Sequence, residues 1–183
     1  MPFDDRTRIV AGADGMERLA GATVSVYGLG GVGATAAMDL VRAGVGRLLV
    51  ADFDTISETN LNRLYFGYSD TIGRTKASVL AEFARRVNPL VVIEEVGTFV
   101  SGAGAAKLIY DDSDYHLDCI DTLNAKVNLM AALARAGMNF SSAMGTAGRM
   151  APERLRIGSL WDATGCPLAA DTRKRLRRLG FGP

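Results

Sequence analysis

The sequence predicts an α/β fold of the Rossmann-like type: a doubly wound, mostly parallel sheet with helices on both faces. Two observations carry this prediction. Short runs rich in Val, Ile and Leu alternate with amphipathic stretches long enough for helices, which is the rhythm of a parallel sheet. A glycine-rich turn also follows the first apolar run and opens the first such stretch. The 183 residues show no repeat and no low-complexity linker, so we expect residues 1–183 to form a single domain.

The first half of the chain contains three predicted strands and two predicted helices. Residues 22–28 are a β-branched run that ends in glycine, and residues 30–45 follow as an Ala-rich helix. The apolar run over 46–54 predicts a second strand, which ends in acidic residues. An Asn-Pro pair closes the helix predicted over 74–89, because proline cannot continue a helix, and residues 90–96 predict the third strand.

The second half continues this alternation as far as about residue 145. Residues 102–112 predict a shorter helix, and 115–121 predict a fourth strand. The segment 122–137 predicts a helix with glycine at its C-terminal end, and 138–145 a fifth strand.

From about residue 146 the pattern changes. Apolar residues over 154–160 predict an edge strand, and 170–180 predict a basic helix. The whole chain has 21 Lys and Arg against 20 Asp and Glu, but residues 171–183 alone carry +4, which leaves −3 for the rest. The body therefore has no bulk field that attracts nucleic acid, whereas this basic segment has one.

The two cysteines, Cys119 and Cys166, form neither a C-x-x-C pair nor a disulfide framework, which favours a reducing compartment. Cys119 and His116 lie in a predicted strand, where we expect structural roles. The N-terminus has acids where a signal peptide needs a basic and then an apolar segment, and no stretch approaches 18 uninterrupted apolar residues. We therefore expect a cytoplasmic protein that does not enter a membrane.

The turn "GLGGVG" places Gly28, Gly30 and Gly33 at G-x-G-x-x-G spacing, with Gly31 between them, after a strand and before a helix. Such glycines let the backbone approach a pyrophosphate at the helix N-terminus. Asp52 follows about twenty residues later, where a carboxylate accepts hydrogen bonds from ribose hydroxyls. Glycines that serve only close packing, or a nicotinamide cofactor, fit this pattern as well.

Charged residues beyond the second strand favour phosphate chemistry over hydride transfer. The loop "DFDTISETNLNR" carries Asp52 and Asp54 at its start and Arg63 at its end, and Lys76 follows. Fixed cations stabilise charge on phosphate oxygens, and Mg²⁺ held by a carboxylate such as Asp121 bridges them. On spacing alone the two cations are equally well read as solvated side chains, and Asp121 also as a helix N-cap.

The run "VYGLGGVGATAAMDLVRAGVGRLLVADFDTISETNLNR", followed by "IGRTKA", "RVNP" and "CIDT", resembles the ThiF/MoeB superfamily of ATP-dependent adenylating enzymes, which includes ubiquitin-activating enzymes. The resemblance covers residues 6 to about 145. It implies that Asp52 binds the ATP ribose and that Asp121 holds Mg²⁺ near the α-phosphate. It implies triphosphate contacts by Asn60, Arg63 and Lys76.

The same resemblance implies a homodimer, because the segment "DRTRIVAGADGMERL" matches one that reaches across the dimer interface of these enzymes. Arg6 would then enter the partner's nucleotide site. Family members continue past residue 183, so we also expect the chain to lack a C-terminal part that is usual among them.

From about residue 122 onward the chain is similar to the tRNA threonylcarbamoyladenosine dehydratases. These enzymes use ATP to activate the threonine carboxylate of a modified adenosine beside the anticodon, so the resemblance implies tRNA as partner, with "TRKRLRR" supplying phosphate contacts or only a solvated helix face. The matched positions are Ser142, Met144, Gly145, Thr164, Pro167, Leu168, Ala169 and Arg173.

Three other functions stay open. An enzyme that adenylates the C-terminal glycine of a ubiquitin-like sulfur carrier fits "NLNRLYF", although the chain lacks the two C-x-x-C pairs that many such enzymes carry; there Cys166 is the candidate thiol. A protein that binds nucleotide without turnover fits Leu64, which stands where the family has glutamine. The third is a nicotinamide-dependent oxidoreductase.

Overall fold

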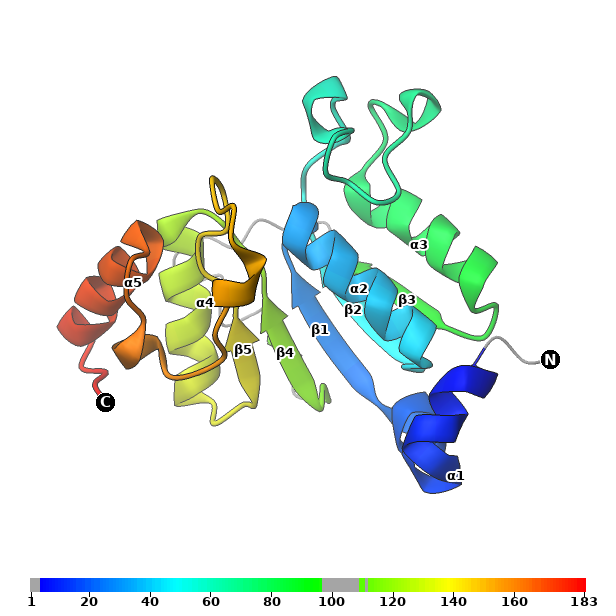
Figure 1. Cartoon of the computed structure of the whole chain (residues 1–183), viewed down its shortest axis with the longest axis horizontal. Coiled ribbons are helices and arrows are strands. Elements are labelled where there is room, and N and C mark those ends of the chain that lie inside the picture. The colour runs from blue at the N-terminus through cyan, green and yellow to red at the C-terminus, as the bar shows by residue number, and fades with distance from the viewer. Residues whose placement is uncertain (1–3, 97–108, 111) are drawn as a thin grey trace.

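The computed structural model describes residues 4–96, 109–110 and 112–183. Its centre is a five-stranded sheet in the order β3-β2-β1-β4-β5, in which every pair of neighbours is parallel (Figure 1). This confirms the predicted Rossmann-like class. The strands are β1 (Thr23–Tyr27), β2 (Arg47–Ala51), β3 (Val92–Val96), β4 (Tyr115–Asp118) and β5 (Phe140–Ser142).

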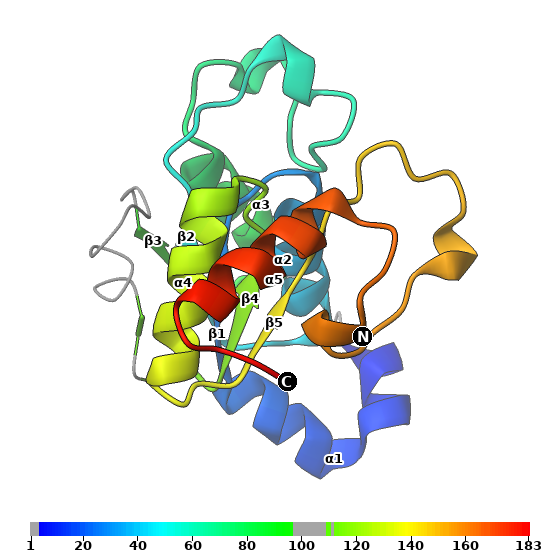
Figure 2. The ribbon, with the colours of Figure 1, turned by 90° about the vertical axis from the view of Figure 1, so that its left-hand side faces the viewer.

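Helices cover both faces of this sheet. The helices α2 and α3 pack on one face and α4 on the other, with α5 lying across the outside of α4 (Figures 1 and 2). Side chains alternate between faces along each strand, so Val26 meets the α2 side whereas Tyr27 meets α4. The helices are α1 (Asp5–Gly21), α2 (Gly31–Ala43), α3 (Lys76–Val87), α4 (Leu123–Arg135) and α5 (Pro167–Arg178).

The central strand β1 is buried along its whole length, because it pairs with β2 on one side and β4 on the other. Opposite Tyr27, the last residue of β1, lie Ala51 of β2 and Asp118 of β4. The carboxyl ends of three strands therefore meet at one edge of the sheet. In open α/β sheets this edge is where ligands bind.

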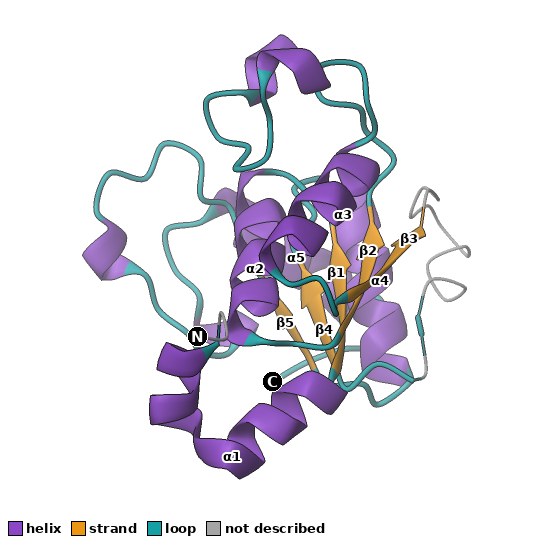
Figure 3. Cartoon of the chain, turned by 90° about the vertical axis from the view of Figure 1, so that its right-hand side faces the viewer, coloured by secondary structure: helices purple, strands orange, loops and turns teal. Residues whose placement is uncertain are grey.

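Helix α1 is absent from the sequence prediction. Its mean hydropathy is low and Met16 is its one buried residue, so the apolar stripe that identifies a helix in a sequence is missing. The helix is kinked at Gly12, whose φ of 70° is left-handed. It precedes β1 and lies at the end of the molecule away from the carboxyl edge (Figure 3).

Four predicted boundaries differ from the structure by three residues, and one predicted strand is wrong. β5 ends at Ser142 rather than at 145, and α5 begins at Pro167 rather than at 170. β2 ends at Ala51 and β4 at Asp118, so Asp52 and Asp121 lie in the loops beyond the strands. Residues 154–160 form no strand; they contain irregular backbone and 3-10 turns, with Leu155 and Ile157 largely exposed. Apolar and polar residues alternate in this run as they do in a strand, but no described strand lies beside it to pair with.

The helix expected over 102–112 lies outside the described residues, apart from 109, 110 and 112. Within the described ranges, each helix is too short or too polar to cross a lipid bilayer.

Candidate active site at the carboxyl edge of the sheet

The glycine turn connects β1 to α2, and its glycines have different structural roles. Gly28 has a left-handed φ of 87°, and its N–H donates to the carbonyl oxygen of Ala51 at 2.8 Å. A Cβ on Gly33 would lie 1.8 Å from the carbonyl oxygen of Gly28, so the fold demands glycine there. A Cβ on Gly30 would meet nothing within 4 Å. The fold therefore requires two of the glycines, whereas Gly30 borders open space at the start of α2.

Asp52 connects the glycine turn to the loop after β2. Its carboxylate is buried, with Oδ2 accepting the Leu29 N–H at 2.5 Å and Oδ1 accepting the Asp54 N–H at 2.7 Å. Each oxygen keeps lone pairs for a further donor. The resemblance predicted Asp52 as a ribose ligand, and the structure brings its carboxylate directly behind the glycine turn.

Lys76 is not the solvated cation that spacing alone allowed. It is the first residue of α3 and is only 7% exposed. Its Nζ lies 2.7 Å from Oδ2 of Asp54 and 3.9 Å from Oδ2 of Asp52. A buried ammonium needs partners, and here they are the two carboxylates that flank the edge of the sheet. Because the Asp54 side chain is half exposed, this pair faces solvent on one side.

Asn60 and Arg63 lie in the turn after β2. The Asn60 Oδ1 accepts the Ser57 N–H at 3.2 Å, and the exposed Arg63 donates from Nη1 to the carbonyl oxygen of Thr59 at 2.6 Å. A Cβ on Gly31 would lie 3.4 Å from the Arg63 carbonyl oxygen, so this turn touches the glycine turn. The structure thus brings Arg63 to the edge, with its guanidinium hydrogen-bonded within its own loop.

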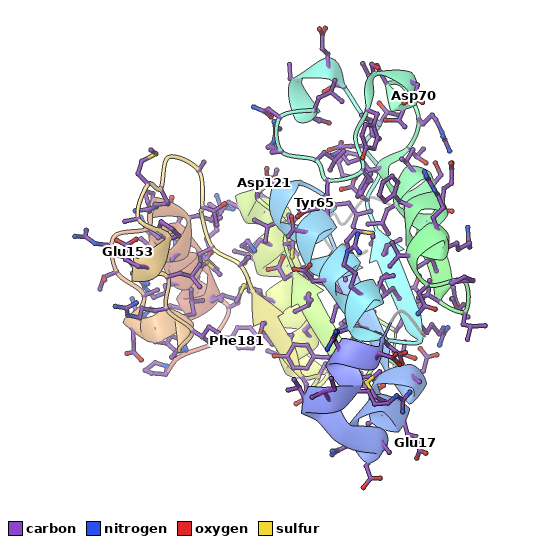
Figure 4. All side chains as sticks on the ribbon, turned by 45° about the vertical axis from the view of Figure 1, so that its right-hand side comes forward. Glu17, Tyr65, Asp70, Asp121, Glu153 and Phe181 are labelled. Carbon is purple, nitrogen blue, oxygen red and sulfur yellow. The ribbon has the colours of Figure 1, made fainter. Side chains whose placement is uncertain are left out.

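Asp121 is exposed in the loop between β4 and α4. Thr122, not Asp121, occupies the N-cap position of α4, so the capping interpretation is wrong. In Figure 4 Asp121 lies at the same end of the molecule as Tyr65, which is in the turn after β2. Within the described ranges no three His, Cys, Asp or Glu side chains cluster as metal ligands. A metal here would therefore take one carboxylate and complete its shell with waters or phosphates, as Mg²⁺ commonly does.

A buried group of three side chains, absent from the sequence prediction, lies beside this loop. The Nζ of Lys126 in α4 is 2.6 Å from Oδ2 of Asp118 and 3.0 Å from the Ser142 hydroxyl oxygen, and that hydroxyl donates to the same Oδ2 at 2.6 Å. Asp118 and Lys126 are fully buried. Removing one partner of such a pair costs roughly 3–5 kcal/mol, because the other charge is left buried and unpaired.

This buried group also fixes the loop that carries Asp121. The second Asp118 oxygen, Oδ1, accepts the Ile120 N–H at 3.1 Å, one residue before Asp121. Burial raises the pKa of Asp118, and Lys126 and Ser142 oppose that rise. The signal in the sequence was a lysine at a buried position of the apolar α4 helix, since Met130 lies four residues further along the same face.

The two cysteines have opposite environments. Burial raises the pKa of the Cys119 thiol to about 11. Burial also raises that of Cys166, but backbone N–H groups of Ala169 and Gly145 bring the net pKa below its ordinary value. Cys119 thus behaves as the predicted core residue. Cys166 occupies the N-cap position of α5.

Arg6 and His116 were also singled out in the sequence. The structure places Arg6 away from this edge and buries His116 in the sheet. Arg6 is exposed on α1, at the other end of the molecule, so within one protomer it does not join the other predicted site residues (Figure 3). His116 is fully buried in β4, and its Nδ1 is 3.0 Å from the Tyr27 hydroxyl, as expected for a structural residue.

The chain as a whole is similar to known proteins. A family model described as the ThiF family matches residues 5–153. The tRNA threonylcarbamoyladenosine dehydratase of Bacillus subtilis is 31% identical over 176 residues, which cover 96% of this chain and 69% of that protein. The crystal structure of the Escherichia coli tRNA N6-threonylcarbamoyladenosine dehydratase in complex with ATP superposes with a TM-score of 0.93 at 32% identity. That match covers 95% of this chain and 72% of the other.

A second group of relatives is named as adenylyltransferases and matches a smaller share of the chain. The molybdopterin-synthase adenylyltransferase of Escherichia coli is 37% identical over 118 residues, or 64% of this chain and 47% of that protein. Among three bacterial dehydratases, the chain spans 62% to 69% of the relative's length.

Proposed function

The chain belongs to the ThiF family, and from this premise we propose that it is an ATP-dependent adenylating enzyme of a single domain. Its proposed reaction is the cyclisation of threonylcarbamoyladenosine in tRNA through an acyl-adenylate. Several bacterial relatives are named for this dehydratase activity. The observation that carries the proposal is the open glycine turn beside the buried Lys76, with Asp52 bridging the two elements.

The reaction needs an activated carboxylate and no protein nucleophile. A carboxylate oxygen of the threonyl group attacks the α-phosphorus of ATP, and pyrophosphate leaves. The carbamoyl nitrogen or oxygen of the same nucleotide then attacks the acyl carbon, AMP leaves, and the attacking group loses its proton. The substrate therefore loses the elements of water, and the oxygen departs in AMP. The chain has to hold both reactants in line and stabilise negative charge on phosphate.

Each residue at the edge has a proposed part in that task. Gly28, Gly30, Gly31 and Gly33 form the turn on which the phosphates rest. Asp52 binds the ribose, and Asn60, Arg63 and Lys76 bind the triphosphate. Asp54 forms an ion pair with Lys76 and so holds its ammonium in place. When ATP binds, its phosphate oxygens would take the place of the Asp54 carboxylate beside that ammonium.

Asp121 is the proposed Mg²⁺ ligand. Its exposed carboxylate fits a cation that is shared with substrate phosphates. When bound, Mg²⁺ would neutralise phosphate charge. The buried group of Asp118, Lys126 and Ser142 holds the Asp121 loop at the edge of the sheet.

We also propose a homodimer in which Arg6 serves the partner's site. The support is its position: Arg6 is exposed on α1, away from the carboxyl edge of its own protomer. An arginine there reaches a nucleotide only through a second copy of the chain.

The alternative function is adenylation of the C-terminal glycine of a ubiquitin-like sulfur carrier. It is favoured by the 37% identity to a molybdopterin-synthase adenylyltransferase over 64% of this chain. The first half-reaction is the same in both functions, so the nucleotide site alone does not separate them.

Pyrophosphate exchange into ATP, measured with the purified chain, tests the proposal. Exchange stimulated by tRNA that bears threonylcarbamoyladenosine, with the cyclic product found by mass spectrometry, supports the dehydratase. Exchange stimulated only by a small protein ending in Gly-Gly supports the alternative. ATP binding without exchange under either condition would indicate a protein without turnover, and binding of NADH in place of ATP would contradict the proposal.

A further inference from the structure

Helix α5 carries a dense group of cations on its exposed side. Lys174, Arg177 and Arg178 are all exposed there. Arg135, at the C-terminal end of α4, lies beside them, because its guanidinium stacks 5.3 Å from the ring centroid of Phe181, just beyond α5. We call Arg135, Lys174, Arg177 and Arg178 the α5 basic surface.

Contacts within the chain explain some basic residues of α5 but not others. Arg173 donates from Nη1 to the carbonyl oxygens of Leu160 at 3.0 Å and Ala163 at 2.6 Å, so it holds the preceding turn in place. The side chains of Lys174 and Arg178, by contrast, form no hydrogen bond or ion pair with any residue that the structure describes. These two cations are fully available to a partner.

Arg175 and Arg177 each make one side-chain contact within the chain. Arg175 donates to the side-chain oxygen of Asn124 in α4, which ties it to the neighbouring helix. Arg177 stacks over the ring of Trp161, 5.4 Å from its centroid, and remains exposed. Its N–H groups can still reach a ligand while the guanidinium face is packed.

Local helix energetics account for only part of this charge. Cations in the last turn of a helix are favoured by its dipole, which explains Arg177 and Arg178. Lys174 lies one turn earlier, on the same stripe as Arg178, and like charges four residues apart repel. Asp171 is the single acid of the helix, and it forms no ion pair with any of the described residues. Asp171 lies three residues before Lys174 and offsets part of this repulsion, but three exposed cations against one acid leave the stripe with net positive charge.

We infer that the α5 basic surface binds the phosphate backbone of the tRNA whose modified nucleotide is adenylated. This inference rests on the proposed function. Phosphate contacts need exposed, long cationic side chains and little else, which is what this face offers. A protein partner would need several apolar anchors at the centre of the interface, and beside these cations the large exposed apolar side chain at the end of α5 is Leu179.

The position of α5 suits a large, folded substrate. The helix begins beside Gly145, which follows β5 at the carboxyl edge, since the Gly145 N–H donates to Cys166 Sγ at 3.3 Å. It is 12 residues long, about 18 Å at 1.5 Å per residue. In Figure 4, Asp121 marks the carboxyl edge of the sheet, and Phe181 marks the C-terminal end of α5. An RNA stem can rest on the far end of α5 while one nucleotide of its loop enters the edge of the sheet.

The test compares two double variants with the same loss of charge. Lys174→Ala with Arg178→Ala removes the unpaired cations of the surface. Arg42→Ala with Arg85→Ala removes two exposed cations from α2 and α3, on the other face of the sheet. Fluorescence anisotropy with labelled tRNA gives the dissociation constant over a series of salt concentrations, and ATP affinity and thermal unfolding serve as checks on folding.

We expect the α5 double variant to bind tRNA roughly tenfold more weakly at low salt, with a salt slope shallower by about two, because each lost phosphate contact removes about one unit. The control variant should bind as the wild type does, and all three proteins should bind ATP equally.

Each contrary outcome points to one failure. An α5 variant that binds tRNA like the wild type, while the wild type cyclises the modified nucleotide, overturns this inference and leaves the proposed function standing. A wild type that neither binds tRNA nor responds to it in pyrophosphate exchange overturns the proposed function, and the inference falls with it. A variant that loses affinity only for a Gly-Gly-ended carrier protein would assign the surface to a protein partner and overturn the inference.

Discussion

The Nζ of Lys76 lies 2.7 Å from Oδ2 of Asp54, and it forms this ion pair from a buried position whereas Asp54 is half exposed. The aspartate can turn toward solvent when another anion approaches, but the lysine cannot follow it. The pair therefore keeps a cation at the edge of the sheet in a fixed place. A triphosphate that binds there would replace one carboxylate by phosphate oxygens without moving the lysine.

Lys76→Met should reduce pyrophosphate exchange by roughly 10²–10³-fold, because it removes a preorganised cation from the phosphates. Asp54→Asn keeps the lysine and should have a much smaller effect. Exchange rates at saturating ATP, with thermal unfolding as the folding check, make the comparison. Equal losses in the two variants would mean that the ion pair, and not the cation, matters.

Gly33→Ala and Gly30→Ala should separate folding from binding. The first places a Cβ 1.8 Å from a carbonyl oxygen, so we expect insoluble or strongly destabilised protein. The second meets nothing within 4 Å and needs no left-handed backbone, so the protein should fold with its thermal midpoint little changed. If the phosphates of ATP bind at the glycine turn, Gly30→Ala should still bind ATP more weakly, as measured by calorimetry. Unchanged affinity would place the phosphates elsewhere.

Asp121→Ala should abolish Mg²⁺-dependent exchange while leaving the fold intact, because the side chain is exposed. Asp70→Ala removes another exposed acid, in the turn before α3, and is the matched control. Exchange measured against Mg²⁺ concentration checks the expectation. Full activity in the Asp121 variant would remove this carboxylate from the mechanism.

Arg6→Ala should lose exchange activity even though Arg6 lies far from the edge of its own protomer. If two copies share each site, mixing this variant with Asp121→Ala should restore part of the activity, since a hybrid dimer contains one intact site. The mixture is assayed after co-refolding or long incubation. Activity that never returns, although hybrid dimers are found by native mass spectrometry, would contradict the shared site.

The two thiols should react with iodoacetamide at different pH. At pH 8 Cys166 should react first, because its pKa lies below the ordinary value of a thiol whereas that of Cys119 is raised. With a pKa of about 11, Cys119 is still a protonated thiol at that pH and should stay unmodified until the solution is far more alkaline. Peptide mass spectrometry against pH, with urea-unfolded protein as the reference, measures both rates. Equal rates in the folded protein would contradict these environments.

The sequence was sufficient for the sheet and most of its helices, because strand and helix periods are local properties. It gave no indication of α1, which contacts the body through few apolar side chains, the buried Met16 and the partly buried Leu19. The false strand over 154–160 shows the converse: alternation is local, whereas pairing needs a neighbour that only the fold supplies.

The sequence predicted those parts of the site that belong to a recognisable motif. Gly28, Gly33 and Asp52 were recognised by spacing, and the structure brings them together. Lys126 and Asp118 were missed: a lysine on the apolar face of α4 signals a buried cation, but the linear pattern does not say which strand end supplies its partner. Whether a given charge is buried depends on the packing of both elements.

The arrangement of strands has a mechanical consequence. Beyond its end β1 supplies the glycine turn, while Asp52 and Lys76 come from its β2 side and Asp121 from its β4 side. A ligand that touches all of them would join the β2 side of the sheet to the β4 side. At a hundred times its dissociation constant such a ligand would stabilise the folded state over the unfolded state by about 2.7 kcal/mol.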